Sequence, residues 1–320
     1  MTRSNEADYA VLTASRVYTR FVTSAVGRSS KRKKVKPTPF PEQNGDFPFN
    51  ASGVVRVGPR RFVFIDNKDP AALFEMTFDV NVAVVERIHR RRLAGVGQGM
   101  LLDPEGLTRV DLNGETFLIV SSSLSVGSGH RRINDGLVRV RYLPEGDLPA
   151  EAMDGFRAWL LAQEPTLAAS GLREPDAGGL NVEGLTWDPD AKALLFGLRG
   201  PVRPGRVSMV QVPVDVGEAR WTTALLGPPV VASARSAAAQ GIRDISYDAR
   251  TGDFLLLLGR STSRGEEPFQ LCTWNRGSDA VRLLDITFHR TAKPEGITTF
   301  SIGDEHKILV VDDTGGYAVL

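Results

Sequence analysis

After residue 50 one pattern of apolar and polar positions recurs along the chain. Each copy has a short apolar segment, which holds a glycine in four of the five copies, then a polar turn, and then a strongly apolar segment. The first segments of the five copies are 52–56, 105–108, 183–188, 243–248 and 295–298. The second segments are 62–65, 117–120, 194–196, 254–258 and 308–311. All ten segments have the length of β-strands, so the pattern predicts paired strands rather than helices.

The spacing of the copies predicts the architecture. Their starts are separated by 53, 78, 60 and 52 residues, and periods of this size are typical of propeller blades and solenoids. Further strand-like segments and turns such as Asn113-Gly114 follow within each copy. We therefore predict an all-β fold, a β-propeller with five blades whose first strands line a central channel. A sixth blade is the alternative if residues before 50 form one. A β-sandwich would not explain the recurring Glu-Gly-(Leu/Ile)-Thr.

Two irregularities complete this interpretation. Residues 149–164 carry apolar side chains at helical spacing and are followed by Pro165, so we expect one helix inserted between two blades. This helix would account for the long 78-residue step. The last copy ends at Leu320 with only about three strands. We expect a strand from the N-terminal region to complete that blade and close the ring.

The N-terminal part of the chain does not match the repeat. Residues 29–36 read SSKRKKVK, with five cationic side chains, and prolines follow at 37, 39 and 41. This composition predicts a partly flexible extension over residues 1–46, with a basic linker at 29–36, before a propeller domain at 47–320. A basic cluster can bind an anionic partner or act as a localisation signal. A weakly packed tail is the preferred interpretation.

Composition excludes several classes of protein. The chain has 39 Lys and Arg against 38 Asp and Glu, so its charge of +1 gives no reason to expect nucleic acid as a partner. Its single cysteine, Cys272, excludes an internal disulfide and a cysteine-rich metal site. No apolar run approaches the ~18 residues that span a bilayer, and the first residues are polar. We therefore expect a cytoplasmic protein that is not membrane-bound. The sequence does not indicate its oligomeric state.

Three pairs of segments resemble a known family. They are 181–188 with 195–201, 241–248 with 257–260, and 293–298 with 310–313. Together they are similar to the bacterial family known as domain of unknown function 3616, over roughly residues 50–320. The resemblance implies a propeller-like fold and no established activity. A looser similarity links the Glu-Gly-(Leu/Ile)-Thr segments to propellers with phytase-like esterase or calcium-dependent lactonase activity.

Equivalent positions of the repeats suggest a site. The residue before the recurring glycine position is, in turn, Ser52, Glu105, Glu183, Arg243 and Glu295. If the first strands surround a channel, three carboxylates and one guanidinium converge and the carboxylates raise one another's pKa. Glu105, Glu183 and Glu295 could then bind Ca²⁺, or Mg²⁺, through oxygen ligands. Two alternatives stay open. Arg243 could be the internal counter-ion, or each glutamate could cap neighbouring backbone N–H groups.

A second set of polar residues follows the second strands: Asp66-Asn67-Lys68, Ser121 to Ser123, Arg199, Arg260 and Asp312-Asp313. In antiparallel strands these positions lie at the same rim as the glutamates. Mixed guanidinium and carboxylate groups suit a small anionic ligand such as a phosphate or carboxylate. A ring of salt bridges between blades is the equal alternative.

Two functions follow from these positions. The first is a divalent-metal-dependent hydrolase of a phosphoester or lactone, with candidate catalytic residues Arg199, Arg243, Arg260 and Asp312. The second is a non-catalytic ligand-binding or scaffold propeller whose channel charges are structural.

Overall fold

The computed structural model describes residues 34–45, 47–79, 81, 83–236 and 239–320. Within these residues the fold is all-β, as predicted, and its strands form antiparallel groups of four. The first group contains β2 (Ala51–Arg56), β3 (Arg61–Asp66), β4 (Ala72–Asp79) and β5 (Val84–Ala94). The second contains β6 (Pro104–Leu112), β7 (Glu115–Ser122), β8 (Leu137–Arg141) and β9 (Leu148–Ala152). A short parallel pairing of β5 with β9 joins these two groups into one eight-stranded sheet.

Three further groups are separate four-stranded sheets. The third contains β10 (Asn181–Asp188), β11 (Ala193–Arg203), β12 (Arg206–Pro213) and β13 (Val230–Arg235). The fourth contains β14 (Gly241–Asp248), β15 (Asp253–Gly259), β16 (Gln270–Trp274) and β17 (Arg282–Leu283). The last contains β18 (Pro294–Ile302), β19 (Glu305–Asp312), β20 (Gly316–Val319) and β1 (Thr38–Pro39).

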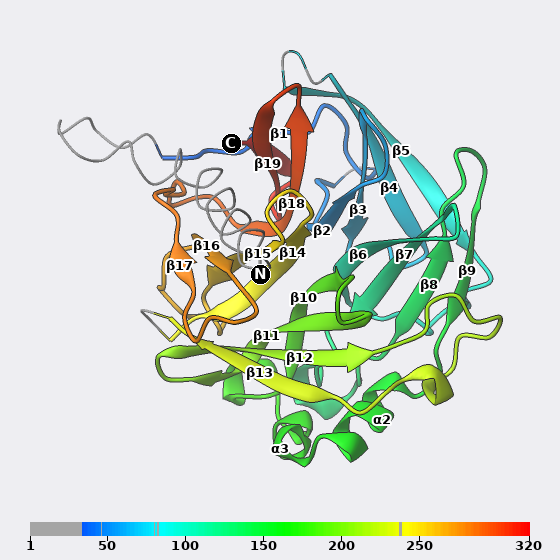
Figure 1. The fold of residues 1–320 in the computed structure, drawn as a ribbon, viewed down its shortest axis with the longest axis vertical. Helices are drawn as coiled ribbons and strands as arrows, with labels where there is room; N and C mark the ends of the chain where they lie inside the picture. The colour runs from blue at the N-terminus through cyan, green and yellow to red at the C-terminus, as the bar shows by residue number, and fades with distance from the viewer. Residues whose placement is uncertain (1–33, 46, 80, 82, 237–238) are drawn as a thin grey trace, which may run out of the picture.

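The first strands of the groups form a closed ring. β2 contacts β6, β6 contacts β10, β10 contacts β14, β14 contacts β18, and β18 returns to β2. The other strands lie progressively farther from this ring, which gives the propeller-like arrangement in Figure 1. The ring therefore places the starts of five strands, and the side chains that the repeat aligned, around one centre.

The recurring glycine and threonine have separate roles in this ring. A Cβ on Gly184 would lie 2.9 Å from the backbone nitrogen of Ile245, so only glycine permits this approach of β10 to β14. The hydroxyl of Thr186 accepts a hydrogen bond of 2.8 Å from the backbone N–H of Tyr247, again between these two strands. Thr108 accepts the equivalent bond from Trp187, also at 2.8 Å. Both residue types thus hold neighbouring first strands together.

The inserted helix is shorter than the sequence predicts. Helix α2 spans Phe156–Gln163, whereas residues 148–152 form β9 and pair with β8. The predicted range of 149–164 is therefore wrong in its first part. Gly155, with a φ of 69°, lies between the two elements and starts the helix. The short helix α3 (Pro165–Ala168) follows directly.

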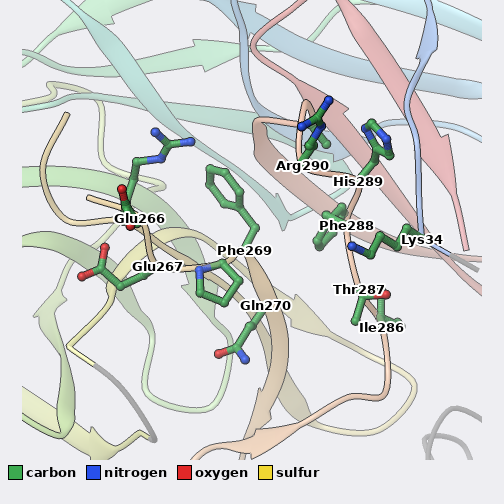
Figure 2. A pocket seen from close by; sticks show the side chains of 13 residues that line it. Lys34, Glu266, Glu267, Phe269, Gln270, Ile286, Thr287, Phe288, His289 and Arg290 are labelled. Atoms are coloured by element: carbon green, nitrogen blue, oxygen red, sulfur yellow. The ribbon is translucent and has the colours of Figure 1, made fainter. Parts of the chain in front are cut away.

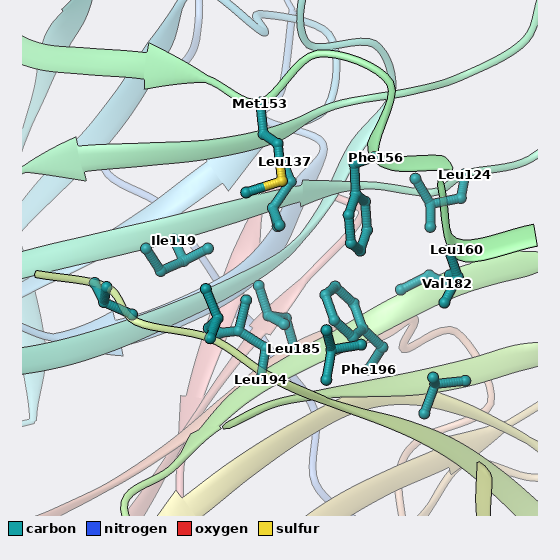
Figure 3. Packing of buried hydrophobic residues seen from close by; sticks show 14 of the residues in the cluster. Ile119, Leu124, Leu137, Met153, Phe156, Leu160, Val182, Leu185, Leu194 and Phe196 are labelled. Atoms are coloured by element: carbon teal, nitrogen blue, oxygen red, sulfur yellow. The ribbon is translucent and has the colours of Figure 1, made fainter. Parts of the chain in front are cut away.

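Helix α2 covers the largest apolar cluster of the fold. Phe156 points from the helix toward Phe196 of β11, and Leu160 lies beside Val182 of β10 (Figure 3). The rings of Phe156 and Phe196 are 5.3 Å apart at their centroids. The insertion thus fills the space beside the second and third groups of strands and buries apolar surface there.

The N-terminal region closes the last sheet, as expected. Thr38 and Pro39 of β1 pair antiparallel with Tyr317 and Gly316 of β20. The next residue, Phe40, is buried against Phe64 of β3 and Tyr317. β1 therefore lies inside the predicted extension of residues 1–46 and is part of the sheet. The basic run at 29–33 lies outside the described residues. No helix in the described part of the chain is long and apolar enough to cross a membrane.

Candidate functional site

A β-bulge lies at the aligned polar position in four of these first strands and one residue after it, at Gly53, in β2. In β10 the pairing passes from Val182 to Gly184 and leaves Glu183 without a partner on β11. The residues skipped in the same way in the other first strands are Gly53, Glu105, Arg243 and Glu295. A bulge bends the strand and redirects the side chain of the extra residue. Four of the five skipped residues are the charged ones that the repeat predicts to converge.

Arg243 lies between two of the glutamates. Its Nε is 2.9 Å from Oε2 of Glu183, and its Nη2 forms an ion pair with Oε1 of Glu295. Arg199, which lies within β11 and not at its end, contacts the other oxygen of Glu183 at 2.6 Å. Arg243, Glu183 and Glu295 are all buried. We call Ser52, Glu105, Glu183, Arg243 and Glu295 the channel ring.

Electrostatics keep Arg243 charged in this buried position. Burial alone lowers its pKa, but the charges of Glu183 and Glu295 outweigh that effect and raise the pKa above its ordinary value. For Glu295, burial raises the pKa to about 7, while Arg243 acts in the opposite direction. Arg243 therefore occupies the place between two carboxylates that a bound cation would otherwise take.

Glu105 is the member of the channel ring without a cationic partner among the described residues. Its Oε1 accepts a hydrogen bond of 3.4 Å from Asn67, and it is buried. Burial and then the nearby Glu183 and Glu295 raise its pKa well above the usual range, although a hydrogen bond from Ser52 lowers it. Ser52 also donates to Glu295 over 3.2 Å. This shift favours the protonated form of Glu105.

Replacing Glu105 with glutamine should therefore change stability little at pH 7, by less than about 1 kcal/mol, because the amide resembles the protonated acid. Between pH 4.5 and pH 8 the unfolded chain ionises Glu105 before the native protein does, so the wild type loses stability as pH rises. The variant should lose less over the same range. Urea unfolding at several pH values measures this difference. A large loss of stability at pH 7 would show that Glu105 is ionised in the native protein.

The residues predicted at the ends of the second strands do not all join the channel ring. Arg199 joins it through Glu183. Arg260 instead lies over the ring of Phe269, 5.7 Å from its centroid. Arg243 lies 6.0 Å from the same centroid. Arg260 and Arg243 thus both lie against the ring of Phe269, and among the described residues Arg260 has no ion pair with the channel ring.

Asp312 has a local role in the structure. It is fully buried, and its Oδ2 accepts a hydrogen bond of 2.6 Å from the backbone N–H of Lys293. Its Oδ1 accepts one of 3.0 Å from the N–H of Thr314, in the turn between β19 and β20. These contacts fix the turn and use both carboxylate oxygens. Ser123 is likewise held by Asp103, at 2.6 Å, in a hydrogen-bonded cluster of its own.

A pocket of about 400 Å³ opens beside Arg260 and Phe269. We call it the rim pocket. Its walls come from the loop between β15 and β16, from residues 286–292 between β17 and β18, and from Lys34 (Figure 2). Sequence reasoning missed this pocket, because its loops carry no repeated pattern. It also missed Asn181, which donates to Oε1 of Glu183 over 3.2 Å.

Two comparisons bear on the family of this chain. Residues 160–318 match the model of the family described as "Protein of unknown function (DUF3616)". This confirms the resemblance drawn from the sequence, over a shorter range than the expected residues 50–320. No curated protein matches the chain.

Solved structures of low sequence identity also match the chain. The major allergen Mala s 1 of Malassezia sympodialis is 9% identical, with a TM-score of 0.46, over 85% of this chain and 90% of that one. A putative 6-phosphogluconolactonase from Bacteroides uniformis is 13% identical, with a TM-score of 0.34, over 83% of this chain and 68% of that one. A luciferin-regenerating enzyme is 12% identical, with a TM-score of 0.38, over 82% and 70%.

Proposed function

Residues 160–318 belong to a family of unknown function, and from that premise we propose that the chain is a five-bladed β-propeller that acts as a non-catalytic binding protein. In this proposal the charges of the channel ring are structural and hold the blades in register. A small charged ligand binds at the same rim. The predicted cytoplasmic location and the absence of a nucleic-acid partner stay predictions.

The position of Arg243 carries this proposal. Its guanidinium contacts Glu183 and Glu295 on the two neighbouring first strands, and Arg199 adds a second cation to Glu183. Arg199 and Arg243 thus pair with the carboxylates of Glu183 and Glu295 without a further ion, and the raised pKa of Glu105 favours its neutral form. A paired, hydrogen-bonded set of buried charges favours a unique arrangement of the surrounding strands.

A metal-dependent hydrolase is the second candidate, because three carboxyl groups do converge in the channel ring. The donor set fits Ca²⁺ or Mg²⁺ poorly, since Glu183 and Glu295 already direct oxygens at Arg243. Among the residues that the structure describes, no group of three or more His, Cys, Asp or Glu is arranged to hold a metal ion. Calcium binding therefore stays a prediction from the sequence, and we derive no catalytic step from it.

A calcium titration separates the two candidates. We expect the melting temperature of the wild-type protein to be the same with EDTA and with added Ca²⁺, because Arg243 occupies the cation position. Glu183→Gln should be equally insensitive to calcium. If calcium instead stabilises the wild type, by about 2.7 kcal/mol at 100 times Kd, and the variant loses that stabilisation, the hydrolase is supported.

An assay of hydrolysis provides an independent readout. The wild type should cleave chromogenic phosphoesters and lactones no faster than the Glu105→Gln variant does. Turnover by the wild type that the variant lacks would overturn the non-catalytic proposal.

A further inference from the structure

The rim pocket carries two acidic side chains on one wall, in the loop that also holds Arg260, and basic side chains on the other. Glu266 and Glu267, in the loop between β15 and β16, lie on one side. His289, Arg290 and Lys34 lie on the other (Figure 2). The two walls come from segments that are far apart in the chain, so local sequence alone does not account for the separation of charge.

Within the described residues these charged groups have no ionic partners. No ion pair there involves Glu266, Glu267, Arg290 or Lys34. Moreover, Oε2 of Glu267 is shielded from solvent and accepts no hydrogen bond. A shielded carboxylate oxygen without a donor is costly. Because Oε2 lies beside Gly265 of its own loop and is shielded, a ligand could meet the unpaired charge of Glu267 only through Oε1.

The space between the two walls is apolar. Phe269 and Phe288 line it together with Pro268 and Ile286, and Phe288 is buried. Arg260 also lines the pocket, with its guanidinium over the face of Phe269. A volume of about 400 Å³ is in the lower part of the range for small-molecule sites.

We infer that the rim pocket binds a small zwitterion with an apolar side chain, such as an amino acid or a dipeptide. The cationic amino group would pair with Glu267, the carboxylate with Arg290 and Lys34, and the apolar part would cover Phe269 and Phe288. A simple anion or a simple cation would satisfy one wall and leave the other unpaired. This inference rests on the proposed binding role and gives that role a ligand class.

Calorimetric titration of the full chain tests the inference with three probes: the dipeptide Ala-Phe, its N-acetylated form and its C-terminal amide. We expect the free dipeptide to bind and each capped form to bind at least ten times more weakly, because each lacks one of the two charges. Inorganic phosphate should bind more weakly than the dipeptide as well.

Two variants and one control locate the site. Glu267→Gln and Arg290→Gln should each weaken binding of Ala-Phe at least tenfold, with melting temperatures unchanged, since neither side chain has an ionic partner among the described residues. Arg282→Gln is the control, because Arg282 is exposed on β17 and does not line the pocket. The control should bind like the wild type.

The inference is overturned if the capped forms or phosphate bind as tightly as Ala-Phe. It is also overturned if Ala-Phe does not bind, or if both pocket variants bind like the control. None of these results affects the calcium and hydrolysis measurements, which concern the channel ring. Failure of the ligand class is therefore distinguishable from failure of the non-catalytic proposal.

Discussion

Replacing Arg243 with alanine should lower the free energy of unfolding by about 3–5 kcal/mol at pH 8, the usual cost of removing one partner of a buried ion pair. Arg243 is buried and contacts Glu183 and Glu295. Without it, two carboxylates face each other with only Arg199 nearby. We expect this to be the largest effect of any single charge removal in the channel ring.

The loss should be smaller at pH 5 than at pH 8. In the wild type burial already raises the pKa of Glu295 to about 7, and removing Arg243 raises it further. The native variant then binds more protons than its unfolded chain above pH 4.5, so its stability falls as pH rises. At pH 5 the protonated carboxyls no longer repel each other, and most of the stability returns.

Urea unfolding at pH 5 and pH 8 measures both effects. Arg203→Ala is a suitable control, since Arg203 is exposed at the end of β11; it should change stability by less than about 0.5 kcal/mol. If Arg243→Ala matches this control at both pH values, the glutamates do not interact through Arg243 and the proposed structural role is wrong.

Phe40→Ala should cost about 3–5 kcal/mol, the usual range for a buried phenylalanine. The side chain is 7% exposed, and its ring centroid is 5.2 Å from that of Phe64 and 5.6 Å from that of Tyr317. It therefore ties the segment after β1 to both the first and the last groups of strands. Its loss should weaken the closure of the ring as well as the local core.

Phe47→Ala is the matched control, because Phe47 lies seven positions further on and is 68% exposed. Its free energy of unfolding should stay within about 0.5 kcal/mol of the wild type. Deletion of residues 1–28, which do not match the repeat, should also leave unfolding cooperative. Equal midpoints for Phe40→Ala and Phe47→Ala would mean that β1 does not close the last sheet in solution.

The architecture was predictable because the same physical constraint acts in every repeat. Close approach of neighbouring first strands requires glycine at positions such as 106 and 184, and this requirement leaves a visible period in the sequence. The start of α2 was not predictable, because the segment 149–152, which reads Pro-Ala-Glu-Ala, has no pattern that separates a helix from a strand. This segment forms a strand because it pairs with β8, a contact that lies outside the segment itself.

The part of the candidate site that lies on the repeat was predictable for the same reason, and the rest was not. Glu183, Arg243 and Glu295 converge because they occupy one position of the repeat and share its bulge. Arg260 and Asp312 follow the second strands, but their directions depend on Phe269 and on a turn that the repeat does not encode. The rim pocket was missed for a similar reason. Its opposed charges come from loops of different sheets, and no periodicity relates them.

The pairing of β1 with β20 imposes an order on folding during synthesis. Residues 38–39 leave the ribosome long before their partners at 316–317, by roughly 15–55 s at ordinary rates of translation. Until then β1 has no strand to pair with, and Phe40 has no Tyr317 to cover it. The nascent chain therefore presents open strand edges during most of its synthesis, which is when capture by a chaperone or by another chain is easiest.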